Sequence, residues 1–346
     1  MKKLNFILII IIFFFKTGNV LSNNSIFNVD NIEIDRTKYE NEGIMLDEVL
    51  YNGFIKLINR ILLKDDIEAV SSTNINQIRN IISHYQITNS EDKNLNDKTK
   101  VNILFDREQI NKFFYKQNIS YADISDSKIV IFPILIENDN FYLYSNNYFY
   151  KNWNNKEADK NKHIEYILPV EDLESYEIIK NNFNDLEKID ISKLLNDYDI
   201  KDYVYIIINN SKNKLDIFIK GKISNKEVVK SISFKNNNSS NIFENAIASI
   251  KKEIIEIIKS QNLIDVRTPS FLNVNFILKE KKDLLNIQNI LTKIEVIESF
   301  SVQELKKDHA KIKIKYYGKL GKIKEKFIKN GVKIKYSRDV WSITLI

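Results

Sequence analysis

The sequence predicts a protein of the α+β class. Two kinds of apolar pattern predict it. In some segments apolar residues recur at three- and four-residue steps, which indicates amphipathic helices. In others they alternate with polar residues, which is typical of half-buried strands. Both patterns occur throughout the chain, so we expect helices and strands to pack together in several modules.

The composition of the chain excludes some chemistries. It has 346 residues, a formal net charge of +6, 43% hydrophobic residues and no cysteine. Disulfides, thiol catalysis, thiolate metal sites and iron–sulfur clusters are therefore excluded. The three histidines, His84, His163 and His309, lie too far apart in the sequence for a typical metal motif. We expect no metal and no cofactor.

The amino terminus has the composition of a secretory signal. Lys2 and Lys3 precede an unbroken apolar run at 9–15, and the small residue Ser22 follows. As a helix, about 12 apolar residues cover roughly 18 Å, short of the roughly 30 Å hydrocarbon core of a bilayer. We therefore expect residues 1–22 to be a cleaved signal peptide and the mature protein to be periplasmic. The alternative is an uncleaved signal that tethers the chain to the inner membrane. No later stretch predicts a transmembrane helix.

The first mature segment, 23–146, predicts an α/β module. Asp106 followed by Gln109 is a capping box that predicts the start of a helix. The expected elements are a strand at 27–34, helices at 41–63 and 74–85, a loop at 88–100, a strand at 101–105, a helix after Asp106, and a hairpin of 128–136 with 141–145.

The second segment, 147–265, predicts an α+β module. Its last helix has the clearest pattern, because Ile247, Ile250 and Ile254 fall on one face. The expected elements are helices at 147–156, 170–181 and 185–197, strands at 203–208, 214–220 and 227–234, and a helix at 242–259.

The third segment, 266–346, predicts strands and helices in the order βαββαβ, which is the order of the ferredoxin-like fold. The expected elements are a strand at 271–278, a helix at 281–293, strands at 295–304 and 311–317, a helix at 320–329 and a strand at 332–346, either continuous or interrupted. This fold hosts many unrelated activities, so it predicts no function by itself.

The N-terminal segment also resembles a known family. Ile32-Glu33-Ile34-Asp35-Arg36-Thr37 precedes a helix that holds Gly53-Phe54, Leu57-Ile58 and Arg60-Ile61, and a later strand ends in Phe105-Asp106. On these residues the chain resembles the domain of unknown function 2066 family of bacterial exported proteins. The resemblance implies export and an α/β fold, and it brings no catalytic residues. The chain departs from the family at Leu63-Lys64-Asp65-Asp66, where the family has a small turn, and it lacks the family's Trp/Arg-Pro approach to the apolar strand.

The charge of the chain is unevenly distributed. Residues 306–346 hold 12 Lys and one Arg against three acidic residues, a net charge of +10. Since the signal peptide carries +3 of the total +6, residues 23–305 carry −7. Lysines alternate with apolar residues at 311–316 and again at 332–336, so they should line one side of each predicted strand. The candidate residues for binding an anionic surface are Lys311, Lys313, Lys315, Lys319, Lys322, Lys333 and Lys335.

These observations favour a non-catalytic envelope protein, a binding or assembly factor. Its basic C-terminal module would bind an anionic surface, such as phospholipid or a cell-wall polymer, or an acidic protein. A merely solvated strand face explains the pattern equally well. One alternative is a carboxylate-based periplasmic hydrolase, which requires two facing carboxylates in a deep pocket. A second is KH-like nucleic-acid binding through Gly318-Lys319-Leu320-Gly321, which requires this loop to join two helices.

Overall fold

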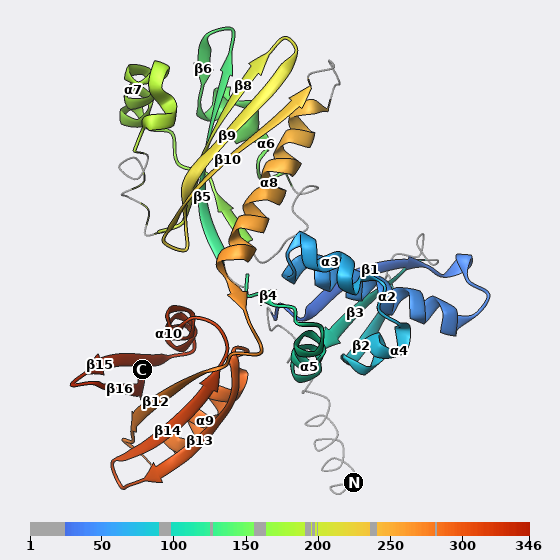
Figure 1. Cartoon of the computed structure of the whole chain (residues 1–346), viewed down its shortest axis with the longest axis vertical. Coiled ribbons are helices and arrows are strands. Elements are labelled where there is room, and N and C mark those ends of the chain that lie inside the picture. Colours follow the sequence, from blue (N-terminus) through green and yellow to red (C-terminus); the bar gives the residue numbers. More distant parts are fainter. Residues whose placement is uncertain are drawn as a thin grey trace, which may run out of the picture.

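The computed structural model describes residues 25–89, 98–124, 127–155, 164–190, 195, 198, 200–235, 241–280 and 282–346. Within them the protein is α+β, as predicted, with helices packed on several sheets (Figure 1). The predicted signal peptide, 1–22, lies outside the described residues. Among the helices that are described, none combines the length and apolarity needed to span a membrane.

The N-terminal unit is a three-stranded antiparallel sheet covered by a long helix. The strands have the order β1-β3-β2. The helix α2 packs closely because Gly53 faces the sheet, where a Cβ atom would lie 2.5 Å from Ile103 Cδ1. The elements are β1 (Asn28–Asp35), η1 (Arg36–Lys38), α2 (Glu42–Ile61), α3 (Lys64–Ser71), α4 (Ile75–Asn80), β2 (Ile82–Asn89), β3 (Lys98–Phe105) and α5 (Arg107–Gln117).

Two local predictions in this unit have different outcomes. The Asp106 carboxylate accepts a hydrogen bond from the Gln109 backbone nitrogen at 2.9 Å, which confirms the predicted start of α5. The helix predicted at 74–85 is wrong beyond Asn80, because 82–89 form β2 and pair with β3. Ladder hydrogen bonds to a distant strand override the local helical spacing there.

The central unit is a six-stranded mixed sheet. Five strands follow the order β10-β9-β8-β5-β6, and β7 also pairs with β5. The helix α8 packs on one face, and η3 with α7 packs on the other. The elements are β5 (Ser127–Glu137), β6 (Asn140–Tyr142), η2 (Tyr144–Asn146), α6 (Tyr148–Asn152), β7 (Ile164–Ile167), α7 (Leu173–Asn181), η3 (Phe183–Lys188), β8 (Tyr203–Ser211), β9 (Lys214–Ile223), β10 (Lys226–Lys235) and α8 (Ile242–Gln261).

The predicted boundary between residues 146 and 147 lies between two strands that pair with each other. The strand predicted at 128–136 is β5, which pairs in parallel with β8 of the central sheet rather than with the N-terminal strands. The residues of β5 are almost continuously buried on both faces, as expected for a strand with parallel neighbours in a sheet that is covered on both sides. The helix predicted at 147–156 is shorter than expected, because only 148–152 form α6. Where a helix was predicted at 185–197, the described residues form the end of the 3-10 helix η3 and a non-helical segment at 189–190, and 191–194 and 196–197 lie outside the described residues.

The C-terminal unit is a five-stranded sheet with two helices. The strands have the order β13-β14-β12-β16-β15. The elements are β12 (Ser270–Ile277), α9 (Asp283–Lys293), β13 (Ile297–Leu305), β14 (His309–Tyr316), α10 (Leu320–Lys329), β15 (Val332–Ser337) and β16 (Val340–Leu345).

The last strand of the predicted βαββαβ order is a hairpin instead. Arg338 and Asp339 both have positive φ, which forms a tight turn between β15 and β16. The strand β16 pairs in parallel with β12 and so lies between β12 and β15. The predicted ferredoxin-like unit therefore contains one extra strand, in the position beside β12.

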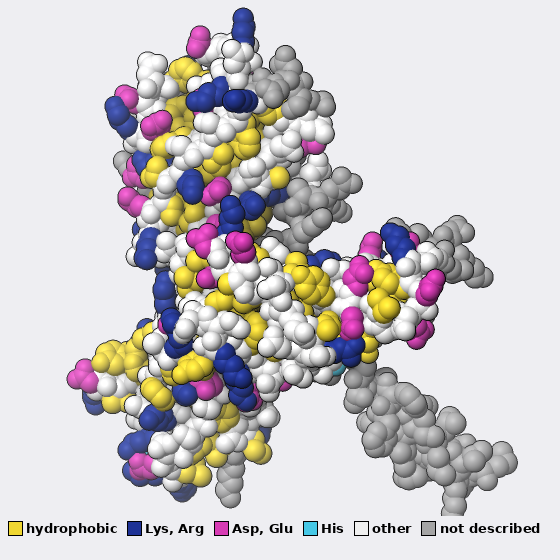
Figure 2. Space-filling model, turned by 45° about the vertical axis from the view of Figure 1, so that its right-hand side comes forward, with side chains coloured by type: hydrophobic (Ala, Val, Ile, Leu, Met, Phe, Trp, Pro, Cys, Tyr) yellow, Lys and Arg dark blue, Asp and Glu magenta, His cyan; other side chains and the backbone are white. Residues whose placement is uncertain are grey.

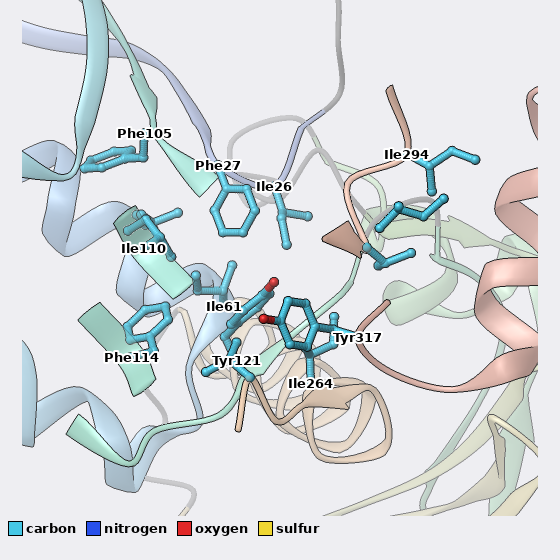
Figure 3. Close-up of a cluster of buried hydrophobic side chains, with 14 of the residues drawn as sticks. Ile26, Phe27, Ile61, Phe105, Ile110, Phe114, Tyr121, Ile264, Ile294 and Tyr317 are labelled. Atoms are coloured by element: carbon cyan, nitrogen blue, oxygen red, sulfur yellow. The ribbon is translucent and has the colours of Figure 1, made fainter. Parts of the chain in front are cut away.

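The N-terminal and C-terminal units share one hydrophobic core. A short ribbon of β4 (Tyr121–Ala122) and β11 (Leu263–Ile264) leads into it. Figure 3 shows Phe27 and Tyr121, from the first half of the chain, near Ile264 and Tyr317, from the second half. The boundary predicted between 265 and 266 therefore divides the sequence but not this core.

Candidate functional site

The lysines of β14 and β15 lie on the same face of the C-terminal sheet. Lys311 is paired with Asn275, Asn275 with Ser342, and Ser342 with Lys335. Residues paired across strands point to the same face, so this row places Lys311 and Lys335 on one side of the sheet. The same ladders place five of the seven predicted lysines on that side: Lys311, Lys313, Lys315, Lys333 and Lys335.

This lysine face is open to solvent. The helices α9 and α10 bury Leu291 and Phe327 against apolar residues on the other side of the sheet. Lys311, Lys313, Lys333 and Lys335 are exposed. Figure 2 shows dark blue side chains spread over the C-terminal unit, at the lower left of the view. The lysines form two rows separated by β12 and β16, which at three strand spacings is about 14 Å.

Two lysines of the β14 row are paired with glutamates of β13. Lys311 Nζ lies 2.5 Å from a Glu304 carboxylate oxygen, and Lys315 Nζ lies 2.9 Å from one of Glu298. Hydrogen bonds from Lys306 and Lys311 lower the pKa of Glu304 to about 2. Glu304 therefore stays ionised and offsets the charge of Lys311 over the whole physiological range.

The other three lysines have no acidic partner within the described residues. Lys313 Nζ lies 4.7 Å from the ring centroid of Phe271, which is a cation–π contact. Lys333 and Lys335 on β15 form no ion pair with any carboxylate in the described part of the chain. These three side chains supply the uncompensated positive charge of the lysine face.

Lys319 and Lys322, the other two candidate residues, do not lie on the lysine face. Both lie at the start of α10, beside the small cavity that Asp123, Asn262 and Tyr317 also line. Lys319 Nζ donates to the Gln261 backbone oxygen at 2.5 Å. Burial lowers the pKa of Lys319, and the charges of Lys226 and Lys322 lower it further. These lysines contact the junction between units instead.

The loop that predicted KH-like binding joins a strand to a helix. Residues 309–316 form β14, and Gly318 and Gly321 connect it to α10. Gly318 has a φ of +86°, which explains the glycine at that turn. A Cβ atom there would contact Ile264 at 3.4 Å, so β11 already covers this side. The requirement for a loop between two helices is not met, and the KH-like alternative is wrong.

A surface groove with a volume of about 470 Å³ lies on the central sheet beside η3. Its carboxylates include Asp185 and Asp216, but both form ion pairs, with Lys188 at 2.6 Å and Lys214 at 2.8 Å. Hydrogen bonds from Lys214 and Ser233 lower the pKa of Asp216. A general acid needs a raised pKa, so Asp216 does not fit the proton-donating role in a hydrolase. The described residues also contain no cluster of three metal-ligating side chains.

The sequence did not predict that the charge of Lys259 is buried. Lys259 is only 2% exposed, and its Nζ donates to the backbone oxygens of Asn59 at 2.8 Å and Leu62 at 2.7 Å. It also pairs with Glu256, whose other oxygen accepts from the Lys64 nitrogen at 3.1 Å. The burial of Lys259 could have been inferred from its position, which directly follows Ile258 beside the apolar stripe of α8.

Comparison with known proteins finds little. No protein-family model and no curated protein match this chain. Among solved structures, the crystal structure of lipoprotein GNA1162 from Neisseria meningitidis matches with 16% sequence identity and a TM-score of 0.23. The match covers 37% of this chain and 96% of that chain. Similarity at this level does not establish a shared fold.

Proposed function

We propose that this chain is an exported, non-catalytic envelope protein that binds an anionic partner through the lysine face of its C-terminal sheet. The main support is the convergence of two separate strands on one open face. Lys313, Lys333 and Lys335 add uncompensated charge there. A lysine near an anionic surface contributes about 1 kcal/mol to binding.

Export and the family resemblance belong to the same proposal. Residues 1–22 act as a signal peptide, and the mature protein works in the periplasm. We also propose membership of the domain of unknown function 2066 family, on the residues of the resemblance. Asp35 caps the turn after β1, and Arg60 near the end of α2 donates to the backbone oxygens of Ile26 and Asn28.

The test reverses the three unpaired lysines in the mature chain. The variant Lys313→Glu, Lys333→Glu, Lys335→Glu is titrated with phosphatidylglycerol vesicles and with polygalacturonate, at low and high salt. At about 1 kcal/mol for each lysine, affinity for the polyanion that the wild type binds should fall about 100-fold at low salt. High salt should weaken the wild type most, because screening acts on exposed charges.

The matched control carries the same change in net charge away from the lysine face. Lys116, Lys151 and Lys252 are exposed residues of the other two units, and all three are changed to Glu. The control should keep nearly wild-type affinity. Equal losses in both triple variants would show that net charge alone drives binding and would refute a specific lysine face.

A further inference from the structure

A strip of neutral polar side chains separates the two lysine rows. Asn273 and Asn275 of β12 lie on the lysine face, because they are paired with Lys313 and Lys311. On the neighbouring strand β16, Ser342 is paired with Asn275, and Thr344 with Lys333. The centre of the face therefore carries carboxamides and hydroxyls, with lysines on both flanks.

Most of this strip is available to a ligand. Ser342 Oγ donates to the Lys335 backbone oxygen at 3.3 Å. The side chains of Asn273, Asn275 and Thr344 make no hydrogen bond to any part of the chain that the structure describes. Each carboxamide offers two donors and an acceptor, and each hydroxyl offers one donor and two acceptor lone pairs.

An aromatic ring lies at one end of the strip. Phe271 is 55% exposed, and it precedes Asn273 on the same face of β12. Its ring is held against Lys313 Nζ at 4.7 Å. A positioned, solvent-facing ring supplies a flat apolar surface on which a sugar ring can stack.

We propose that the lysine face binds an anionic polysaccharide, which lies across the strands from one lysine row to the other. This inference rests on the proposed function and names its partner. The lysine rows would bind carboxylate or phosphate groups of the polymer, the strip of Asn273, Asn275, Ser342 and Thr344 would bind its hydroxyls, and Phe271 would stack on a sugar ring.

The dimensions and the chemistry of the face favour this partner. A single anionic group cannot contact both rows, because they lie about 14 Å apart. A bilayer surface would match the lysines, but it presents no array of hydroxyls to the carboxamides. A polysaccharide has repeated charges and hydroxyls along one chain, so it satisfies both parts of the face. Charge complementarity and hydrogen-bonding capacity thus point to the same partner.

The test separates hydrogen bonding from charge. The double variant Asn273→Ala, Asn275→Ala is compared with Asn286→Ala, Asn289→Ala, which changes two exposed residues of α9 in the same unit. Affinities are measured by calorimetry for three probes: polygalacturonate, polyaspartate as a polyanion without hydroxyls, and phosphatidylglycerol vesicles. Circular dichroism verifies that each variant is folded.

The expected result is specific to one probe. The variant in the strip should lose about tenfold or more in affinity for polygalacturonate, since two neutral hydrogen-bonding groups are removed, and should bind the other probes like the wild type. The α9 variant should be unchanged on all three. Phe271→Ala should also weaken polygalacturonate binding more than polyaspartate binding.

Other outcomes overturn the polysaccharide inference, and they show whether the proposed function fails with it. If the strip variant binds polygalacturonate as the wild type does, recognition depends on charge alone and the polysaccharide is rejected. If the wild type binds vesicles and not polygalacturonate, the partner is a lipid surface, and the lysine face survives without the polysaccharide. If the wild type binds none of the probes, both proposals fail.

Discussion

Replacing Lys259 by Met should destabilise the contact between α8 and α2 by about 3 kcal/mol. The ammonium group makes three hydrogen bonds, to the oxygens of Asn59, Leu62 and Glu256, all between 2.7 and 2.8 Å. Two acceptors are carbonyls at the end of α2, where helical partners are lacking. Met keeps much of the aliphatic packing but leaves these acceptors unpaired.

The magnitude follows from the buried groups that lose their partner. An unsatisfied buried acceptor costs about 1–3 kcal/mol, and breaking a buried ion pair costs about 3–5 kcal/mol. Removing the ammonium also relieves its own desolvation cost, and the half-buried Glu256 regains water, so we expect the lower part of that range. The assay is equilibrium urea unfolding, with hydrogen exchange of the α2 amides as a local readout.

The control is Lys252→Met on the exposed side of the same helix. It should change the free energy of unfolding by no more than about 0.5 kcal/mol. If the two variants are equally stable, and the exchange rates at the end of α2 match, then Lys259 does not hold α8 to α2 and the reasoning is refuted.

Three further predictions concern other positions. Gly221→Ala should cost about 3 kcal/mol in thermal denaturation, because its Cβ atom would lie 2.1 Å from the Tyr203 carbonyl oxygen; a wild-type melting temperature would contradict the tight strand pairing. Gly321→Ala, at a helical position with open space around it, should instead stabilise the protein by about 0.5–1 kcal/mol, and a loss of stability would show that the glycine is required. Burial raises the pKa of Glu295, so the contribution of this carboxyl group to stability should fall as pH rises above about 4.3, its pKa in unfolded chains. Glu295→Gln should therefore be more stable than the wild type at neutral pH and equal to it below about pH 4; unfolding curves at both pH values decide this.

Elements with a strong local period were predicted closely. The helix expected at 41–63 is α2 (Glu42–Ile61), and the helix expected at 242–259 is α8 (Ile242–Gln261). In both, a continuous apolar stripe packs against a sheet, so local pattern and tertiary packing agree. The element β2 was missed because its residues alternate weakly and are held by pairing with β3, a strand farther along the chain.

Some features of the candidate site could likewise be predicted from the sequence, and others could not. The outward direction of Lys311, Lys313 and Lys315 follows from the two-residue period of a strand, and β14 confirms it. The ion pairs of Lys311 with Glu304 and of Lys315 with Glu298 could not be predicted. Irregularities in the register between β13 and β14 set which residues lie opposite each other. The position of Lys319 and Lys322 away from the lysine face could not be predicted, because charge alone does not tell which surface the start of a helix contacts.

The local features of this protein follow from the sequence alone: its α+β class, the basic C-terminal segment, and the alternation that exposes lysines on each strand. These depend on neighbours within a few positions, where backbone geometry fixes the direction of a side chain. In contrast, the folding of distant segments places two lysine strands on one face, with Asn273 and Asn275 between them. Strand order depends on contacts between distant segments, and the hairpin of β15 and β16 inserted one strand that brought the two rows to opposite flanks of a polar strip.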